Sequence, residues 1–135
     1  VDDEEEFCNM LSERLETRGL KVNAVLSGED AVARVENQNF DAIILDLAMP
    51  GIDGLETLRR IKEMRPDLEI VMLTAHGTVK SGIEAMKLGA EDFLEKPVDM
   101  KALLEKISLA KHKRMLIMEK KTQEEVENII KSKSW

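Results

Sequence analysis

The sequence contains a single cysteine, Cys8, and only two histidines in 135 residues. One thiol cannot form an intrachain disulfide, and no group of cysteine and histidine residues suggests a zinc site. Its uninterrupted apolar runs fall far short of the roughly 18 residues that a membrane-spanning helix requires. The first residues, VDDEEEF, are acidic, whereas a secretory signal peptide begins with basic residues. These absences predict a cytoplasmic chain without a membrane segment.

Positive charge is also in deficit. Lysine and arginine number 20 against 27 aspartate and glutamate residues, which leaves a net charge of −7. An acidic body repels nucleic acid, and only the segment KHKRMLIMEKK, which begins at Lys111, is basic. We interpret that segment as the solvated end of a helix and expect no direct contact with nucleic acid. The hydrophobic content of 43% is sufficient for the core of one domain.

Two hydrophobic periodicities alternate along the chain. Apolar residues spaced three or four apart predict helices, and short continuous apolar runs predict buried strands. Ser27 and Asp99 are suitable N-caps for two of the helices. An alternation of this kind predicts an α/β fold, a doubly wound parallel sheet flanked by helices. The predicted strands cover 20–26, 41–46, 69–74 and 92–95. The predicted helices cover 4–18, a segment that begins after Ser27 and includes Val35, a segment from 55 that stops at Pro66, a segment that includes Val79, Ile83 and Met86, and a long segment that begins at Asp99.

Polar residues stand where several of these strands end. Asp46 ends one strand and Thr74 the next, Lys96 follows the last, and Asp2 and Asp3 lie at the start of the chain. In doubly wound sheets such positions converge on one edge, where ligands bind. Clustered carboxylates repel one another unless a cation lies among them, and an all-oxygen ligand set suits Mg²⁺. With a lysine and a hydroxyl for phosphoryl oxygens, the set indicates phosphoryl transfer onto a carboxylate.

Three segments, VDDEEEF, DAIILDLAMPGIDGLE and IVMLTAHGTVKSGIEAMKLGAEDFLEKP, together resemble the receiver domain of two-component response regulators, the chemotaxis Y-protein-like fold. The resemblance covers residues 1 to about 110 and implies a five-stranded sheet. It also implies a phosphorylation switch, in which Asp46 accepts a phosphoryl group from a sensor histidine kinase or phosphotransfer protein. On this resemblance, Mg²⁺ is held by Asp2, Asp3, Asp46 and the backbone carbonyl of Ala48.

The same resemblance assigns roles to the other end of the site. Lys96 pairs with the phosphoryl oxygens, and Thr74 moves toward them. Phe93 changes rotamer with Thr74. We interpret His76, in the loop after Thr74, as a solvent-facing residue that tunes the lifetime of the phosphoryl group rather than as a general base. Pro97 matches a proline whose peptide bond, here with Lys96, is cis in this family.

Other interpretations remain open at this stage. Asp46 could cap a strand end, Phe93 could be plain core, and Asp2 and Asp3 could favour a helix N-terminus through its dipole. A phosphatase of the haloacid-dehalogenase type also uses an aspartyl nucleophile and Mg²⁺, but its second acid would stand at Ala48. A flavin carrier shares the fold, but no phosphate-binding loop rich in serine, threonine and glycine follows a strand.

The chain departs from the receiver pattern at both ends. The first strand, expected between the strands at 20–26 and 41–46, is reduced to Val1, so a longer chain or a neighbouring molecule would have to supply it. Residues 111–135 form an extension or linker, either a continued helix or a second helix that turns back. The sequence of the third segment resembles that of receivers joined to AAA+ transcription activators of the sigma-54 type. This resemblance implies an output domain beyond this chain. A homodimer through the C-terminal helix is then expected.

Overall fold

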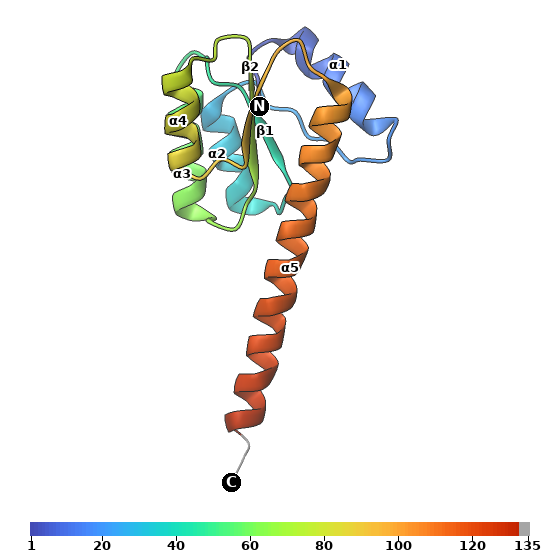
Figure 1. The fold of residues 1–135 in the computed structure, drawn as a ribbon, viewed down its shortest axis with the longest axis vertical. Helices are drawn as coiled ribbons and strands as arrows, with labels where there is room; N and C mark the ends of the chain where they lie inside the picture. Colours follow the sequence, from blue (N-terminus) through green and yellow to red (C-terminus); the bar gives the residue numbers. More distant parts are fainter. Residues whose placement is uncertain (133–135) are drawn as a thin grey trace.

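The computed structural model describes residues 1–132, and the last three residues of the predicted extension, 133–135, lie outside that range (Figure 1). Within the described residues the sheet has three parallel strands in the order β1-β2-β3. Ile43 pairs with Ile70, and Val71 pairs with Asp92. The predicted α/β class and parallel sheet are confirmed. The strands are β1 (Ile43–Leu45), β2 (Ile70–Thr74) and β3 (Asp92–Glu95).

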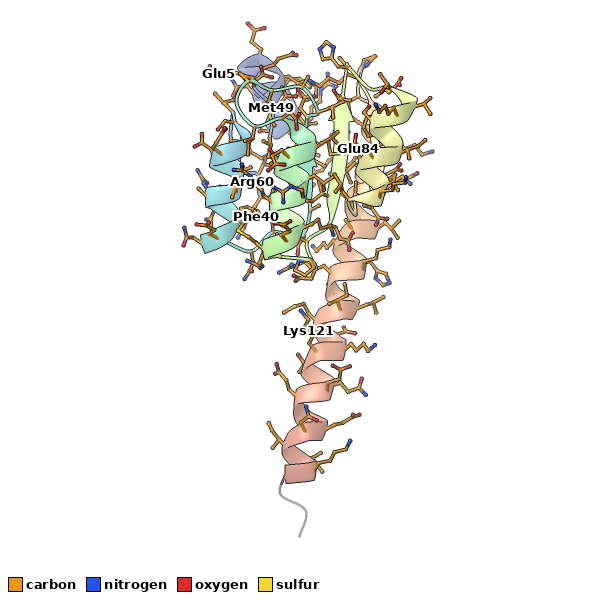
Figure 2. All side chains as sticks on the ribbon, turned by 90° about the vertical axis from the view of Figure 1, so that its left-hand side faces the viewer. Glu5, Phe40, Met49, Arg60, Glu84 and Lys121 are labelled. Carbon is orange, nitrogen blue, oxygen red and sulfur yellow. The ribbon has the colours of Figure 1, made fainter. Side chains whose placement is uncertain are left out.

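Helices cover both faces of this sheet, as a doubly wound fold requires. Figure 1 shows α2, α3 and α4 on one side of the strands and α1 and α5 on the other. In Figure 2 the first group faces the viewer. The helices are α1 (Glu5–Glu16), α2 (Gly28–Asn37), α3 (Gly54–Met64), α4 (Val79–Lys87) and α5 (Met100–Ser132).

The central strand β2 supplies both halves of the core. Its side chains alternate, so Ile70 and Met72 face α2, α3 and α4, whereas Val71 and Leu73 face α1 and α5. All four are almost completely buried. Burying such a side chain contributes roughly 1.5–3 kcal/mol, so the fold depends most on this strand. Burial on both faces explains why the apolar run before Thr74 is continuous in sequence.

The helix starts follow from local capping. The Ser27 side chain accepts a hydrogen bond from the Asp30 N–H, and that of Asp99 accepts from Lys101 and Ala102. Both predicted caps are therefore confirmed. A complete capping box at Thr78 and Ser81, which the pattern analysis did not single out, starts α4.

The predicted strand at 20–26 is wrong, because none of these residues forms a strand. A strand needs a neighbour to pair with, and within residues 1–132 the backbone hydrogen bond that joins this segment to the sheet comes from the start of the chain. The Val25 carbonyl accepts from the Asp2 N–H at 3.2 Å, and on the other side the Val1 carbonyl accepts from the Asp46 N–H at 2.9 Å. Val1 and Asp2 supply too few such backbone hydrogen bonds to either side for a ladder. The expectation that the first strand is largely missing is confirmed, and with it the loss of the pairing for 20–26.

The apolar residues of α4 are oriented differently from those of a core-facing helix. The spacing of Val79, Ile83 and Met86 predicted the helix correctly, but these side chains are exposed, Val79 by 82%. Ala85 is the buried contact of this helix with the sheet.

The final helix α5 continues through the predicted extension instead of turning back. Leu103 and Ala110 pack against the body, and the Arg114 guanidinium, which is nearly buried, donates to Asp67 at 3.2 Å. Beyond it the helix projects away from the domain, where Lys121 marks its path in Figure 2. None of the helices described is long and apolar enough to span a bilayer.

Candidate functional site

Asp46 lies at the carboxyl end of β1 with only 3% of its surface exposed. The apolar residues before it are anchored in the sheet, so the carboxylate is carried to the sheet edge with little freedom to move. Its backbone N–H donates to the Val1 carbonyl. Its side-chain Oδ1 is buried and has no hydrogen-bond partner within residues 1–132. A buried carboxylate oxygen without a partner is costly and indicates a site for a ligand.

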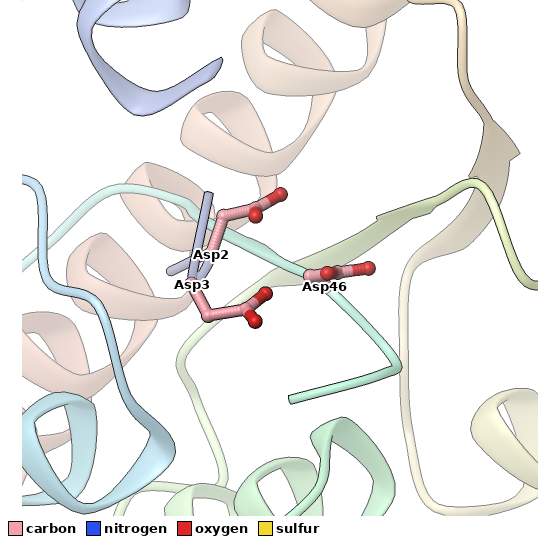
Figure 3. Close-up of side chains that lie close together, drawn as sticks. All are labelled: Asp2, Asp3 and Asp46. Carbon is pink, nitrogen blue, oxygen red and sulfur yellow. The ribbon is translucent and has the colours of Figure 1, made fainter. Parts of the chain in front are cut away.

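Two more carboxylates converge on Asp46. One oxygen atom from each of Asp2, Asp3 and Asp46 lies within 4.8 Å of the others, and Figure 3 shows the three groups side by side. Asp2 is buried like Asp46, whereas Asp3 is exposed. Such a cluster of hard oxygen donors fits a divalent cation such as Mg²⁺, and its Asp46 Oδ1 has no hydrogen-bond partner among the described residues. The sequence prediction that these three residues come together is therefore borne out by the geometry.

Lys96 reaches the same cluster from the end of β3. Its ammonium donates to Asp2 Oδ2 at 2.7 Å and lies 3.9 Å from a Glu4 carboxylate oxygen. Burial disfavours the charged form of Lys96, but the hydrogen bond to Asp2 and the charges of Asp2, Asp46 and Glu4 outweigh it and raise its pKa. In this state the lysine is held by Asp2, next to the carboxylate of Asp46. The peptide bond between Lys96 and Pro97 is cis, as predicted.

Phe7 of α1 also holds this lysine. The Lys96 ammonium lies 4.0 Å from the centroid of the Phe7 ring, within the range of a cation–π contact. Sequence analysis placed Phe7 in the helical stripe of the core and missed this role. The available signal was its position one helical turn after Glu4, which also faces Lys96. Apolar spacing by itself does not distinguish a packing aromatic from one that holds a cation.

Thr74 and Phe93 lie on adjacent strands at the other side of the site. Thr74 is completely buried, and its Oγ1 accepts a hydrogen bond from the His76 N–H at 3.1 Å. The Lys96 N–H donates to the Thr74 carbonyl, which joins the two strand ends. Phe93 is half-buried and packs so close to Gly77 that a Cβ there would lie 2.6 Å from the ring. Movement of the loop after Thr74 is therefore coupled sterically to Phe93.

The loop after Asp46 closes tightly onto the sheet. A Cβ on Gly54 would lie 2.1 Å from the Asp46 carbonyl oxygen, so only glycine allows α3 to start there. Its N–H also donates to the Leu47 carbonyl at 2.7 Å. Ala48, the predicted fourth ligand, is exposed in this loop. An open cleft beside it is lined by Leu47, Ala48, Met49, Pro50, Asp53 and His76.

Comparison with known proteins agrees with this geometry. The family described as response regulator receiver domain matches residues 1–108. The chain belongs to this family. A solved receiver domain protein from Clostridium thermocellum is 33% identical, with a TM-score of 0.81 over 86% of this chain and 94% of that one. A CheY-like receiver domain protein from Methanospirillum hungatei is 25% identical, with a TM-score of 0.81 over 84% and 91%.

Curated relatives of this receiver domain are transcriptional regulators. ZraR of Salmonella typhimurium is 38% identical over 110 residues, which are 82% of this chain and 25% of that protein. DctD of Pseudomonas aeruginosa, named a C4-dicarboxylate transport regulator, is 37% identical over 123 residues, 90% of this chain and 26% of that one. The chain thus spans about a quarter of the length of these relatives.

We expect Phe7→Leu to slow phosphorylation of this receiver domain without unfolding it. Leucine keeps most of the packing but removes the ring face, and a partly desolvated cation–π contact contributes about 1 kcal/mol, or roughly fivefold in rate if Lys96 acts in the transition state. The initial rate of labelling by acetyl phosphate at saturating Mg²⁺ measures this. Phe40→Leu, a partly buried phenylalanine in the core on the other face of the sheet, is the matched control. Equal rates for the two variants would contradict the role of Phe7.

Proposed function

We propose that Asp46 is the phosphoacceptor of this receiver domain. The observation that carries the proposal is its buried Oδ1, which has no hydrogen-bond partner among the described residues although two carboxylates and a lysine surround the site. Asp46 attacks the phosphorus atom of a phosphohistidine. A P–O bond forms, the P–N bond breaks, and the leaving imidazole takes a proton from solvent. The donor is a sensor histidine kinase or a phosphotransfer protein.

Asp2, Asp3, Asp46 and the carbonyl of Ala48 would hold Mg²⁺, which offsets the negative charge of an incoming phosphoryl group. Phosphorylation replaces one negative charge on Asp46 by roughly two. Lys96 then has a stronger partner than Asp2, and Thr74 can donate its hydroxyl to a phosphoryl oxygen. The steric contact between Phe93 and the loop after Thr74 transmits that movement to the surface of α4 and β3. The domain is a switch and not an enzyme that turns over substrate.

No observation favours the haloacid-dehalogenase alternative. Such a phosphatase needs a second acid two residues after the nucleophile, and Ala48 cannot act as an acid. A flavin carrier is not supported either, because the residues converging on this edge are carboxylates, which repel a flavin phosphate.

The direct test is incubation with acetyl phosphate and Mg²⁺ followed by intact mass spectrometry and peptide mapping. We expect one phosphoryl group per chain, located on Asp46, dependent on Mg²⁺ and lost slowly on standing. Continuous release of phosphate from a general phosphate ester would instead support a phosphatase. Labelling elsewhere in the chain would contradict the proposal.

The wider role follows the relatives. Because ZraR and DctD are transcriptional regulators, we propose that this receiver controls a transcriptional output domain of the AAA+ sigma-54 type that lies beyond this chain. The receiver itself contacts neither nucleic acid nor membrane and works in the cytoplasm, where the kinase domain presents its phosphohistidine.

We also propose that the projecting half of α5 pairs two receivers. Leu116, Val126 and Ile130 are each at least half exposed on this segment, and a second copy of the same helix would cover them. Size-exclusion chromatography with light scattering should give dimer mass, and Leu116→Glu with Ile130→Glu should return monomer. Lys121→Glu, which changes charge on the same segment, should leave the dimer intact. Monomer mass for the unmodified chain at high concentration would reject this pairing.

A further inference from the structure

Residues 47–53 form the loop that joins β1 to α3, and Ala48 lies in this loop. The two ends of the loop are close together, because the Gly54 N–H donates to the Leu47 carbonyl at 2.7 Å. Met49, labelled in Figure 2, is buried in the core and holds the inner half of the loop. The outer half is exposed to solvent and needs a contact of its own to keep one position.

Helix α2 supplies that contact through Glu29 in its first turn. The Glu29 Oε1 accepts a hydrogen bond from the Ile52 N–H at 3.0 Å. The two residues are 23 positions apart in the chain, so this hydrogen bond joins the start of α2 to the outer half of the 47–53 loop. A backbone N–H in a loop has no ladder partner, and a carboxylate satisfies it well.

The backbone on both sides of this contact leaves no room for a side chain. A Cβ on Gly51 would lie 2.6 Å from Glu29 Oε1, and the φ of Gly51 is +79°, in the left-handed region that favours glycine. A Cβ on Gly28 would lie 2.7 Å from the Ile52 side chain and 2.1 Å from the Thr57 hydroxyl. Glycine at these two positions therefore allows the carboxylate and the loop to approach this closely.

The carboxylate of Glu29 is also held on the side of its own helix. Although the side chain is exposed, the hydrogen bond from the Ile52 N–H and a second one from its own backbone N–H lower its pKa. Glu29 is therefore ionised at neutral pH, and an ionised acceptor forms a stronger hydrogen bond than a neutral one.

We propose that Glu29 is a positioning residue for the phosphorylation site. Its hydrogen bond to Ile52 fixes the outer half of the 47–53 loop, and so keeps the backbone of Ala48 in the place from which its carbonyl can reach a divalent ion. This inference rests on the proposed function, which assigns that carbonyl to Mg²⁺. A ligand that is already in place loses less conformational entropy when the ion binds, so the contact strengthens Mg²⁺ binding.

The test compares Glu29→Ala and Glu29→Gln with the unmodified chain. Alanine removes the acceptor, whereas the side-chain carbonyl of glutamine can still accept from the Ile52 N–H but carries no charge. Asp30→Ala is the matched control, because it removes an acidic side chain from the same helical turn. The Asp30 N–H, which donates to Ser27, is unaffected by this change.

Calorimetric titration measures Mg²⁺ binding, and NMR measures hydrogen exchange of the Ile52 amide in the absence of Mg²⁺. We expect Glu29→Ala to weaken Mg²⁺ binding roughly threefold to tenfold, the range for loss of one such hydrogen bond, and to speed exchange of the Ile52 amide. In labelling by acetyl phosphate, the half-saturating Mg²⁺ concentration should rise by the same factor, and the rate at saturating Mg²⁺ should stay the same. Glu29→Gln should recover most of the loss, and Asp30→Ala should show none.

Equal weakening by Glu29→Ala and Glu29→Gln would show that only the charge attracts the ion, which would overturn the positioning role. Unchanged Mg²⁺ affinity in Glu29→Ala would overturn it as well, and so would an equal loss in Asp30→Ala. Calorimetry and hydrogen exchange use no phosphodonor. Failure of Asp46 to accept a phosphoryl group would therefore reject the proposed function, while these two measurements still decide the role of Glu29.

Discussion

Asp46→Asn is expected to abolish phosphoryl addition while the domain stays folded. An amide oxygen is a poor nucleophile, and the substitution removes one of the three negative charges that would attract a divalent cation. The side-chain Oδ1 makes no hydrogen bond within the described residues, so no such partner is lost at that atom. Relief of repulsion with Asp2 and Asp3 should leave the unfolding free energy without Mg²⁺ unchanged or slightly higher.

Intact mass after treatment with acetyl phosphate and Mg²⁺ measures this effect. Asp53→Asn is the matched control, because Asp53 lies in the same loop and caps α3 through a hydrogen bond from the Glu56 N–H, which asparagine can also accept. The control should accept one phosphoryl group at close to the normal rate. Equal labelling of the Asp46→Asn variant would remove Asp46 from the chemistry.

Lys96→Met is expected to have the largest effect on stability when Mg²⁺ is absent. The side chains of Lys96 and Asp2 are only 10% and 6% exposed, and their 2.7 Å ion pair is the main compensation for the Asp2 charge. Removing one partner of a buried pair leaves the other charge uncompensated, which costs about 3–5 kcal/mol of unfolding free energy. Because the lysine no longer competes for Asp2, Mg²⁺ should bind more tightly to the variant and restore part of the loss.

Urea unfolding with and without Mg²⁺, and calorimetric titration of Mg²⁺, test both parts of this prediction. Lys106→Met is the matched control, since Lys106 pairs with Asp92 at a site where the side chains are 36% and 31% exposed. A pair this exposed is worth about 1 kcal/mol or less. If the two variants lost equal stability, or if Mg²⁺ bound more weakly to Lys96→Met, the competition for Asp2 would be disproved.

The comparison of pattern and structure shows which kinds of element can be predicted locally. Helices such as α1 and α2 were predicted because their apolar spacing, and for α2 also its cap at Ser27, involve residues close together in the chain. Strand β2 was predicted because burial on both faces makes its sequence continuously apolar. The segment 20–26 has an equally good strand pattern but forms no strand, because a strand exists only with a partner, and among residues 1–132 it is joined to the sheet by a backbone hydrogen bond from Asp2.

Some features of the site could likewise be predicted from the sequence, and others could not. Asp46, Thr74 and Lys96 were predicted as neighbours because the carboxyl ends of parallel strands meet at one edge, a consequence of chain order alone. The partner of Lys96 could not be predicted in this way. Its position between Asp2 and the ring of Phe7 depends on how α1 packs across the end of β3, which places groups together that are 89 or more positions apart in the chain.

The sequence by itself determined the α/β class, the order of the elements apart from the strand expected at 20–26, and the acids, hydroxyl and lysine that share one sheet edge, because periodicity and strand ends are properties of neighbouring residues. Only the tertiary structure decided that Oδ1 of Asp46 has no hydrogen-bond partner among residues 1–132 and that the ring of Phe7 lies against Lys96. These features are set by distances between segments remote in sequence, and packing alone fixes such distances.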